Sequence, residues 1–149
     1  MTDFEKSEKR TYIHGPVASH VLGFTTIDLQ GGAGLERYFD RELTGPGEDF
    51  QISIDMRVQS LVHEELSKGV KQFSALGGTA LMMDVKTGEI IAMVSLPDFD
   101  LNKREAINDV NYINRATKGV YELGSVFKTF TLAGALNEDK IETNTKFKN

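Results

Sequence analysis

The chain has 149 residues, 40% of them hydrophobic, and a formal net charge of −5. This size is enough for one ordinary domain, or for a small domain with part of a second. The acidic balance argues against a nucleic-acid binder, which carries a basic patch or stripe. The absence of cysteine excludes disulfides, thiolate metal ligands and cysteine nucleophiles.

Several kinds of site and signal are not expected in this chain. His14, His20 and His63 lie far apart in the sequence, without carboxylates at ligand spacing, so we expect no metal site and no cofactor. No apolar run approaches the ~20 residues of a membrane-spanning helix, and the N-terminus lacks the apolar core of a signal peptide. We therefore expect neither a membrane span nor a targeting segment here.

The N-terminal third alternates short apolar pieces with turn residues. Residues 1–12 are polar and predict a loosely held start, and residues 13–34 predict extended pieces and turns. Residues 34–43 predict one short helix, because four apolar residues follow helical spacing: Leu35, Tyr38, Phe39 and Leu43. The Gly45-Pro46-Gly47 run ends this helix, and we place a domain boundary near residue 48.

A strand and a long helix are predicted next. Residues 50–54 alternate apolar and polar side chains, which is typical of a strand. Asp55 can cap the following helix, because its carboxylate can accept from backbone N–H groups of the first turn. This helix should run over residues 56–73 and bury one apolar stripe, made of Val58, Leu61, Val62, Leu66, Val70 and Phe73.

Two apolar segments then predict a β-hairpin, with strands at 79–85 and 89–95 joined by a tight turn at Lys86-Thr87-Gly88. Because both strands are apolar at nearly every position, we expect the hairpin to be covered on both faces. Pro97 ends the hairpin, and residues 98–114 predict a polar loop.

A Ser-x-x-Lys pair, Ser125 and Lys128, opens the last apolar segment. A helix starting near Ser125 should bury its apolar side chains: Val126, Phe127, Phe130, Leu132, Ala133 and Leu136. A serine hydroxyl needs a neighbouring base to act as a nucleophile, and a lysine at i+3 lies on the same helix face. Gly124 leaves room for a substrate beside it. From spacing alone, a helix-terminal serine with an exposed lysine remains an alternative.

The surrounding residues make the context more specific. The segments 78–81 and 92–100, Asn114-Arg115-Ala116-Thr117, and 121–131 around Ser125 together resemble the first core hairpin and the nucleophile segment of the class B penicillin-binding proteins. Residues 53–59 resemble the entry into their transpeptidase domain, while residues 18–24 and 34–36 resemble the non-catalytic pedestal that precedes it. The subtype looks closest to the cell-division, septal transpeptidase.

The resemblance implies an α+β fold in two parts. Residues 1–47 would be the C-terminal part of the pedestal domain, and residues 48–149 the N-terminal part of the transpeptidase domain. Ser125 would be the acylated serine and Lys128 its proton acceptor. The implied partners are peptidoglycan stem peptides ending in D-Ala-D-Ala, β-lactams and possible division-complex proteins, with no nucleic acid. The parent protein would lie on the periplasmic face of the bacterial inner membrane.

The chain also departs from the family pattern. The family's site has three elements, S-x-x-K, an S-x-N-like element and K-T-G. Lys86-Thr87-Gly88 spells the third element but precedes Ser125, so we interpret it as a structural turn. The chain therefore resembles an internal fragment, and we expect it to be inactive alone and to give no detectable penicillin adduct. Two alternatives stay open: a non-catalytic binding module, and a class D β-lactamase-like serine hydrolase.

Overall fold

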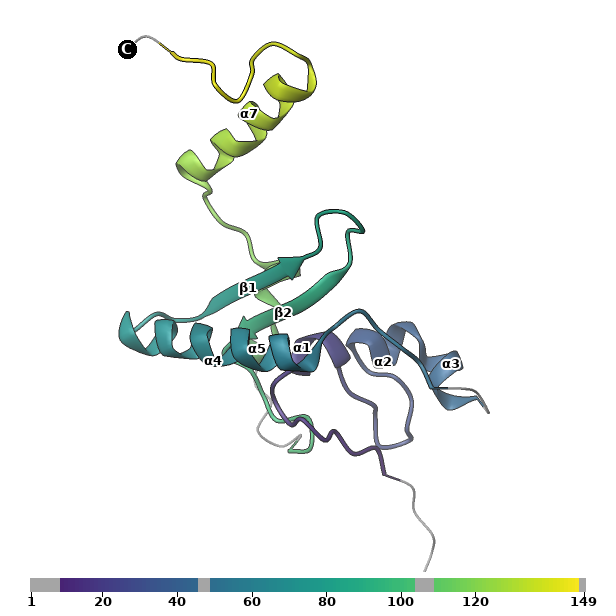
Figure 1. Ribbon diagram of the computed structural model, residues 1–149. Helices are drawn as coiled ribbons and strands as arrows, with labels where there is room; N and C mark the ends of the chain where they lie inside the picture. Colours follow the sequence, from purple (N-terminus) through teal and green to yellow (C-terminus); the bar gives the residue numbers. More distant parts are fainter. Residues whose placement is uncertain (1–8, 46–48, 104–108, 148–149) are drawn as a thin grey trace, which may run out of the picture. The chain divides into compact units, whose positions relative to one another are not determined.

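The computed structural model describes residues 9–45, 49–103 and 109–147. Two compact units make up the chain, residues 1–119 and residues 120–149, and each is described here by itself. The first unit contains a two-stranded antiparallel sheet and most of the helices, and the second contains one helix preceded by a 3₁₀ turn (Figure 1). This mixture of helices and strands confirms the predicted α+β class.

The helices and strands have the following bounds. In the first unit they are α1 (Ser19–Leu22), α2 (Gly34–Tyr38), α3 (Asp40–Thr44), α4 (Met56–Gln72), β1 (Gly78–Met83), β2 (Ile90–Leu96), α5 (Asp109–Tyr112) and α6 (Arg115–Lys118). In the second unit they are the 3₁₀ helix η2 (Gly124–Phe127) and α7 (Lys128–Asn137).

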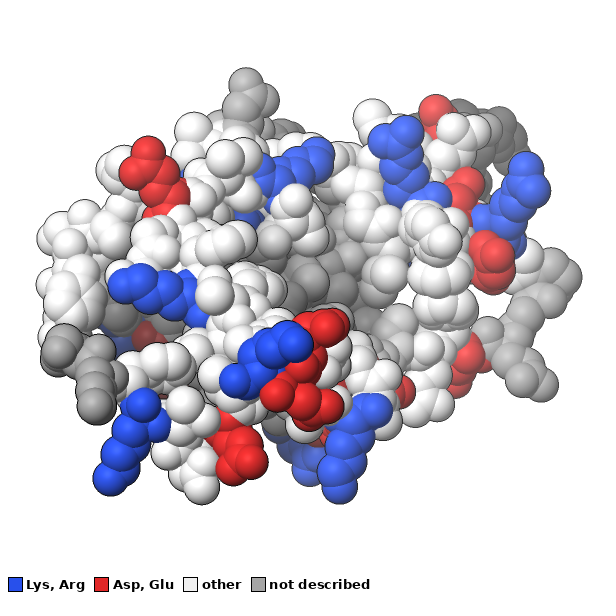
Figure 2. All heavy atoms as spheres, turned by 90° about the horizontal axis from the view of Figure 1, so that it is seen from above, with Lys and Arg blue, Asp and Glu red and all other residues white. Residues whose placement is uncertain are grey.

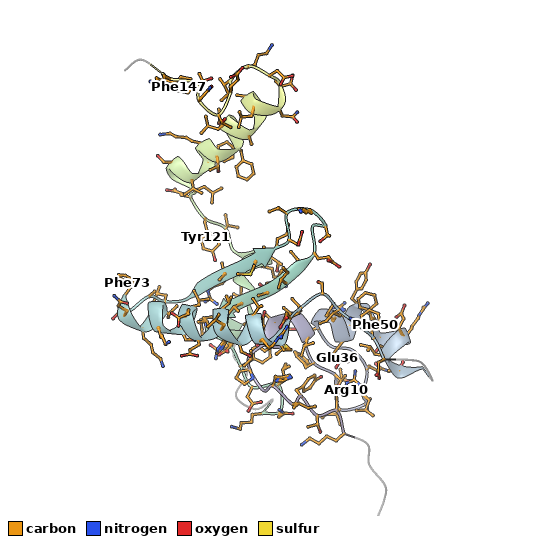
Figure 3. All side chains as sticks on the ribbon, in the orientation of Figure 1. Arg10, Glu36, Phe50, Phe73, Tyr121 and Phe147 are labelled. Atoms are coloured by element: carbon orange, nitrogen blue, oxygen red, sulfur yellow. The ribbon has the colours of Figure 1, made fainter. Side chains whose placement is uncertain are left out.

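The long helix α4 begins where the sequence predicts. The Asp55 carboxylate accepts from the backbone N–H groups of Arg57 and Val58, which satisfies donors that the first turn leaves free. Of the predicted apolar stripe, Leu61 is 60% exposed and Phe73 is 77% exposed, so the prediction was wrong for these two residues. Successive helical residues turn by about 100°, so Leu61 faces away from Gln59, which is fully buried. Phe73 lies beyond the last helical residue, at the end of α4 in Figure 3.

The hairpin is covered unequally. β1 and β2 pair from Gly78↔Leu96 to Met82↔Ala92, with an irregularity after Met82. Four residues of β2 are buried, namely Ala92, Val94, Ser95 and Leu96. In β1, by contrast, Leu81, Met82 and Met83 are each at least 45% exposed. The expectation of cover on both faces was therefore wrong for β1, because α4 packs mainly against β2 in this unit.

The connection between the two strands is a turn held by one carboxylate. Asp84 accepts from the N–H groups of Lys86 and Thr87, and Gly88 has a positive φ of 77°. These bonds hold the pKa of Asp84 below its usual range. Lys86-Thr87-Gly88 therefore forms a turn, as the sequence predicts.

Two local predictions in the N-terminal half were wrong. Residues 50–54 form no strand; they contact β2 through Ser53 Oγ, which donates to Ile90 O (2.7 Å), and through Asp55 N–H, which donates to Ile91 O (3.0 Å). The helix expected at 34–43 is two helices, because Phe39 between them leaves helical geometry (φ −109°, ψ 30°). Its ring packs on Phe50 instead, with centroids 4.3 Å apart.

Two other segments expected to be irregular contain short helices. Residues 13–34 include α1, and the loop predicted at 98–114 includes α5. Both helices have four residues, which is too short for an apolar repeat to be read from the sequence. Of the predicted loose start at residues 1–12, residues 1–8 lie outside the described residues.

The core of the first unit lies between two segments that are distant in the sequence. Tyr12, Phe99 and Leu101 are buried together, and Leu22 and Phe24 pack against them. Polar bonds reinforce this core. The Tyr12 N–H donates to Asn102 Oδ1 (3.0 Å) and Asn102 Nδ2 donates to Tyr12 O (2.8 Å). Residues on both sides of the predicted boundary near 48 thus share one core, and the boundary itself stays a prediction.

Gln59 on α4 joins three parts of the first unit. Its side chain is fully buried, and Nε2 donates to Val17 O and to Met93 O, both at 2.8 Å. Oε1 accepts from Met93 N–H, also at 2.8 Å. One amide therefore satisfies two carbonyls and one N–H that would otherwise be buried without partners.

We expect Gln59→Leu to lower the free energy of unfolding by about 3 kcal/mol, because it leaves buried backbone groups of Val17 and Met93 unsatisfied. Urea unfolding of the chain measures this value. The control is Gln72→Leu, which makes the same change at an exposed position of α4. Equal losses in the two variants would contradict the role given to Gln59.

A second prediction concerns the cap of α4. Hydrogen bonds from Arg57, with its charge, hold the pKa of Asp55 well below 3.8, its ordinary value. A carboxylate with a lowered pKa stabilises the fold above its ordinary pKa, and this contribution is lost as pH falls below it. Asp55→Asn keeps a cap acceptor without a charge. We therefore expect the stability difference between the two proteins to be constant well above pH 3.8 and to shrink as the pH falls through and below this value. A difference that grows in acid would refute this assignment.

Candidate active site

Ser125 and Lys128 lie on consecutive turns of one backbone segment. Ser125 is in η2, and Lys128 is the first residue of α7. The Lys128 N–H donates to the carbonyls of Ser125 and Val126. In a 3₁₀ turn, with three residues per turn, side chains at i and i+3 are eclipsed. The backbone therefore places these two side chains in the same row, more closely aligned than in an α-helix.

Gly124, directly before Ser125, has a left-handed backbone with φ 51°. A Cβ at this position would meet no atom within 4 Å. Glycine is therefore favoured here by the backbone conformation, because other residues rarely adopt positive φ. The space that we expected Gly124 to leave does not by itself explain the glycine.

The apolar side chains around the pair are not buried within their own unit. Among the described residues of 120–149 none is buried; Val126 is 66% exposed and Phe130 is 65% exposed. Phe127 and Phe130 contact each other, with ring centroids 5.5 Å apart. The expectation that this helix buries its apolar side chains was wrong for this unit, because a single helix has no second layer to pack against.

A second feature precedes the Ser125 segment in the chain. Ser95 of β2 is 2% exposed; its Oγ donates to Ile113 O (3.1 Å) and accepts from Arg115 N–H (2.9 Å). Asn114, between them, caps α6 by accepting from Ala116 N–H (3.0 Å). Sequence reasoning missed Ser95, although a hydroxyl in an otherwise apolar strand is a signal that a backbone group needs a partner.

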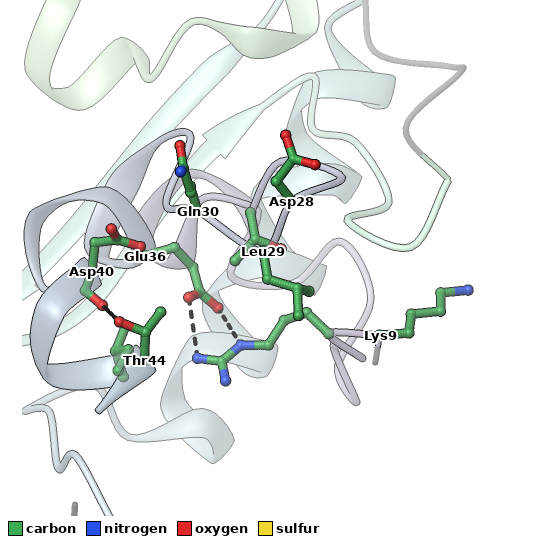
Figure 4. A pocket seen from close by; sticks show the side chains of 10 residues that line it. Lys9, Asp28, Leu29, Gln30, Glu36, Asp40 and Thr44 are labelled. Carbon is green, nitrogen blue, oxygen red and sulfur yellow. Dashed lines mark hydrogen bonds and ion pairs between the residues drawn. The ribbon is translucent and has the colours of Figure 1, made fainter. Parts of the chain in front are cut away.

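A pocket with a volume of about 610 Å³ lies elsewhere in the first unit (Figure 4). Two of its charged side chains, those of Arg10 and Glu36, bind each other. Arg10 Nε and Nη2 donate to the two carboxylate oxygens of Glu36, at 2.8 and 3.1 Å, and Figure 3 shows the two side chains together. This bond raises the pKa of Arg10. Asp40 accepts from Gly31 N–H (2.6 Å). The pocket therefore contains a stabilising ion pair rather than a nucleophile with its base.

Two of the three histidines, His20 and His63, have structural partners. His63 Nε2 lies 2.6 Å from Asp98 Oδ2, a pairing across 35 residues that the sequence did not reveal. His20 Nε2 lies 2.7 Å from Asn111 O, and burial lowers the pKa of His20. Within the described ranges, no group of three or more His, Asp or Glu side chains could hold a metal ion.

The described surface is mixed in charge. On the face drawn in Figure 2, Lys and Arg side chains lie among Asp and Glu side chains. Among the helices that the structure describes, none is long and apolar enough to cross a membrane.

Ser125 and Lys128 thus lie one 3₁₀ turn apart at the start of α7, and both residues are exposed. Residues 78–149 match the family model of the penicillin binding protein transpeptidase domain. The probable peptidoglycan D,D-transpeptidase FtsI of Caulobacter vibrioides is 43% identical over 138 residues, covering 90% of this chain and 23% of that protein. The peptidoglycan D,D-transpeptidase FtsI of Escherichia coli K12 is 32% identical over 165 residues, covering 94% and 28%.

A solved structure agrees with the fold. The chain is similar to the crystal structure of a peptidoglycan synthetase from Bifidobacterium adolescentis, with a TM-score of 0.75, 24% identity and coverage of 96% of this chain and 31% of that one. The chain spans about a quarter of the length of the curated relatives it matches. The chain belongs to the class B penicillin-binding proteins, and residues 78–149 belong to their transpeptidase domain.

We expect Ser95→Ala to loosen the segment 113–118, because it removes the bonds of Ser95 Oγ with Ile113 O and with Arg115 N–H. Amide hydrogen exchange at Arg115 should become about tenfold faster, as the loss of one buried hydrogen bond of about 1.4 kcal/mol implies. Ser60→Ala, an exposed serine of α4 that bonds within its own helix, is the control. Unchanged exchange at Arg115 would rule out this anchoring role.

Proposed function

We propose that this chain contributes the nucleophile of a peptidoglycan D,D-transpeptidase that joins stem peptides through an acyl-serine intermediate. The observation that carries the proposal is the row formed by Ser125 and Lys128 at the η2–α7 junction, in a segment that matches the transpeptidase family model. The named activity of the two FtsI relatives supports the reaction type.

Ser125 and Lys128 have distinct roles in this proposal. Ser125 Oγ attacks the carbonyl carbon of the penultimate D-Ala of a stem peptide, and its proton passes to the Lys128 amine. The peptide bond to the terminal D-Ala breaks, and that D-Ala leaves as a free amine after taking up a proton. An amine of a second stem peptide then attacks the acyl-serine, which restores the Ser125 hydroxyl. β-Lactams would acylate the same oxygen.

The domain assignment belongs to the same proposal. Residues 1–47 would be part of a pedestal, and residues 48–149 part of the transpeptidase domain. The bonds of Gln59 with Val17 and Met93 support a pedestal fixed firmly to the catalytic part, because they join residues 17, 59 and 93 through buried groups. We further propose the septal subtype, on the periplasmic face of the inner membrane, with division proteins as partners.

The alternatives receive less support. A class D β-lactamase-like hydrolase does not account for residues 9–45, which pack with the loop after the hairpin and lie in a chain whose relatives match over 90% and 94% of its length. A purely non-catalytic binding module does not account for the serine–lysine row in a transpeptidase segment.

The test is covalent labelling with fluorescent penicillin of the polypeptide that contains these residues within a whole transpeptidase domain. We expect Ser125→Ala to abolish the adduct and Lys128→Ala to slow acylation by at least about 10³-fold. Removing one member of a catalytic unit costs nearly as much activity as removing the whole unit. Lys140→Ala, a lysine beyond the end of α7, is the control and should label normally.

Three results would contradict the proposal. An adduct that persists in Ser125→Ala would place the nucleophile elsewhere. Normal acylation in Lys128→Ala would mean that Lys128 is not the proton acceptor. Rapid hydrolysis of the adduct, with release of opened penicillin, would favour the hydrolase instead.

A further inference from the structure

A smaller pocket in the first unit lies among four short helices. It has a volume of about 180 Å³ and is lined by residues of α1, α2, α5 and α6 together with Gly23, Ala33, Phe99 and Asn114. Since one water takes up about 30 Å³ in the liquid, this space suits a small ligand of several heavy atoms. It is separate from the large pocket around Arg10 and Glu36.

Ser19, one of the lining residues, carries an unusual hydroxyl. The residue is 1% exposed, and Ser19 Oγ is the one buried side-chain nitrogen or oxygen without a hydrogen-bond partner among the described residues. A buried polar group left unsatisfied is costly, and such exceptions are few in native proteins. A ligand with an acceptor atom would satisfy this donor.

The charge of the lining favours an anion. Lys118 is the only charged residue that lines the pocket in the described part of the chain, and no lining residue is a carboxylate. Asp98 lies close enough to influence His20, but its carboxylate is 2.6 Å from His63 Nε2. Arg115, which also acts on His20, adds a second positive charge nearby.

The remaining polar groups are consistent with a ligand that accepts hydrogen bonds. His20 Nε2 bonds to Asn111 O, a carbonyl that can only accept, so this nitrogen carries the hydrogen. Thr117 Oγ1 is 3.4 Å from Asn114 O, a long bond that a closer acceptor could replace. Ser19, Thr117 and Lys118, which carry two hydroxyls and an ammonium, all line this pocket.

We propose that the pocket lined by Ser19, Thr117 and Lys118 binds a small oxyanion, a carboxylate or a phosphate group. The Lys118 ammonium supplies the charge, and the Ser19 and Thr117 hydroxyls supply donors. Nothing in the proposed acyl-transfer reaction needs this site, so the proposal stands apart from that function.

The experiment titrates the 149-residue chain with sodium acetate and, separately, with inorganic phosphate, at an ionic strength held constant with sodium chloride. Amide NMR shifts of residues 19 and 117–118 report binding. We expect saturable shifts with at least one of the two anions, and the anion that binds more tightly identifies the group that the pocket prefers.

Variants make the test specific. Ser19→Ala and Lys118→Ala should each weaken binding by about tenfold or more, the loss expected for one charge-assisted bond, while Lys118→Arg should retain it. Lys71→Ala, an exposed lysine of α4, should bind like the parent. Shifts that never saturate, or that persist unchanged in both variants, would overturn the proposal.

Thermal melting in buffer free of acetate and phosphate tests whether water, rather than an anion, forms the hydrogen bond with the Ser19 hydroxyl. Removing an unsatisfied hydroxyl should leave the melting temperature of Ser19→Ala equal to or above that of the parent. A lower melting temperature, with no response of the parent to either anion, would mean a hydrated serine and would overturn the site. Lys118 is exposed, so Lys118→Ala should fold in either case.

Discussion

The first unit depends on one buried amide. Gln59 is the point at which α4, β2 and the N-terminal segment meet, and its three hydrogen bonds all go to backbone atoms. Backbone groups cannot be repacked by exchanging side chains, so the geometry of Val17 and Met93 is fixed once Gln59 is in place. Strand β2, which carries Met93, also carries Ser95, the anchor of α6, and is followed in the chain by the core residue Phe99.

The sequence predicted features whose cause is local. The Asp55 cap, the extent of α4, the hairpin and its Asp84 turn each follow from a few neighbouring residues. The prediction was wrong where tertiary contacts determine the local structure. Phe39 leaves helical geometry, and its ring packs on Phe50. Gln59 and Ser95 were missed because a polar residue within an apolar pattern shows neither its burial nor its partner.

In the candidate site too, the sequence predicts what is set locally and not what depends on tertiary contacts. Spacing brings Ser125 and Lys128 together, since three residues are one 3₁₀ turn, and this requires only the backbone. The environment that would tune them is not local, and in their own unit the neighbouring apolar side chains lack a second layer. The sequence therefore predicts the relative positions of Ser125 and Lys128 along the helix more reliably than it predicts their reactivity.

The reciprocal bonds between Tyr12 and Asn102 span 90 residues. During synthesis the N-terminal segment leaves the ribosome long before Asn102, Phe99 and Leu101 are available to it. Its aromatic side chains therefore lack Phe99 and Leu101 as packing partners until about 90 further residues have been translated, a period in which chaperones could bind them. The assembly of this core on the ribosome is thus timed by its later residues rather than by its earlier ones.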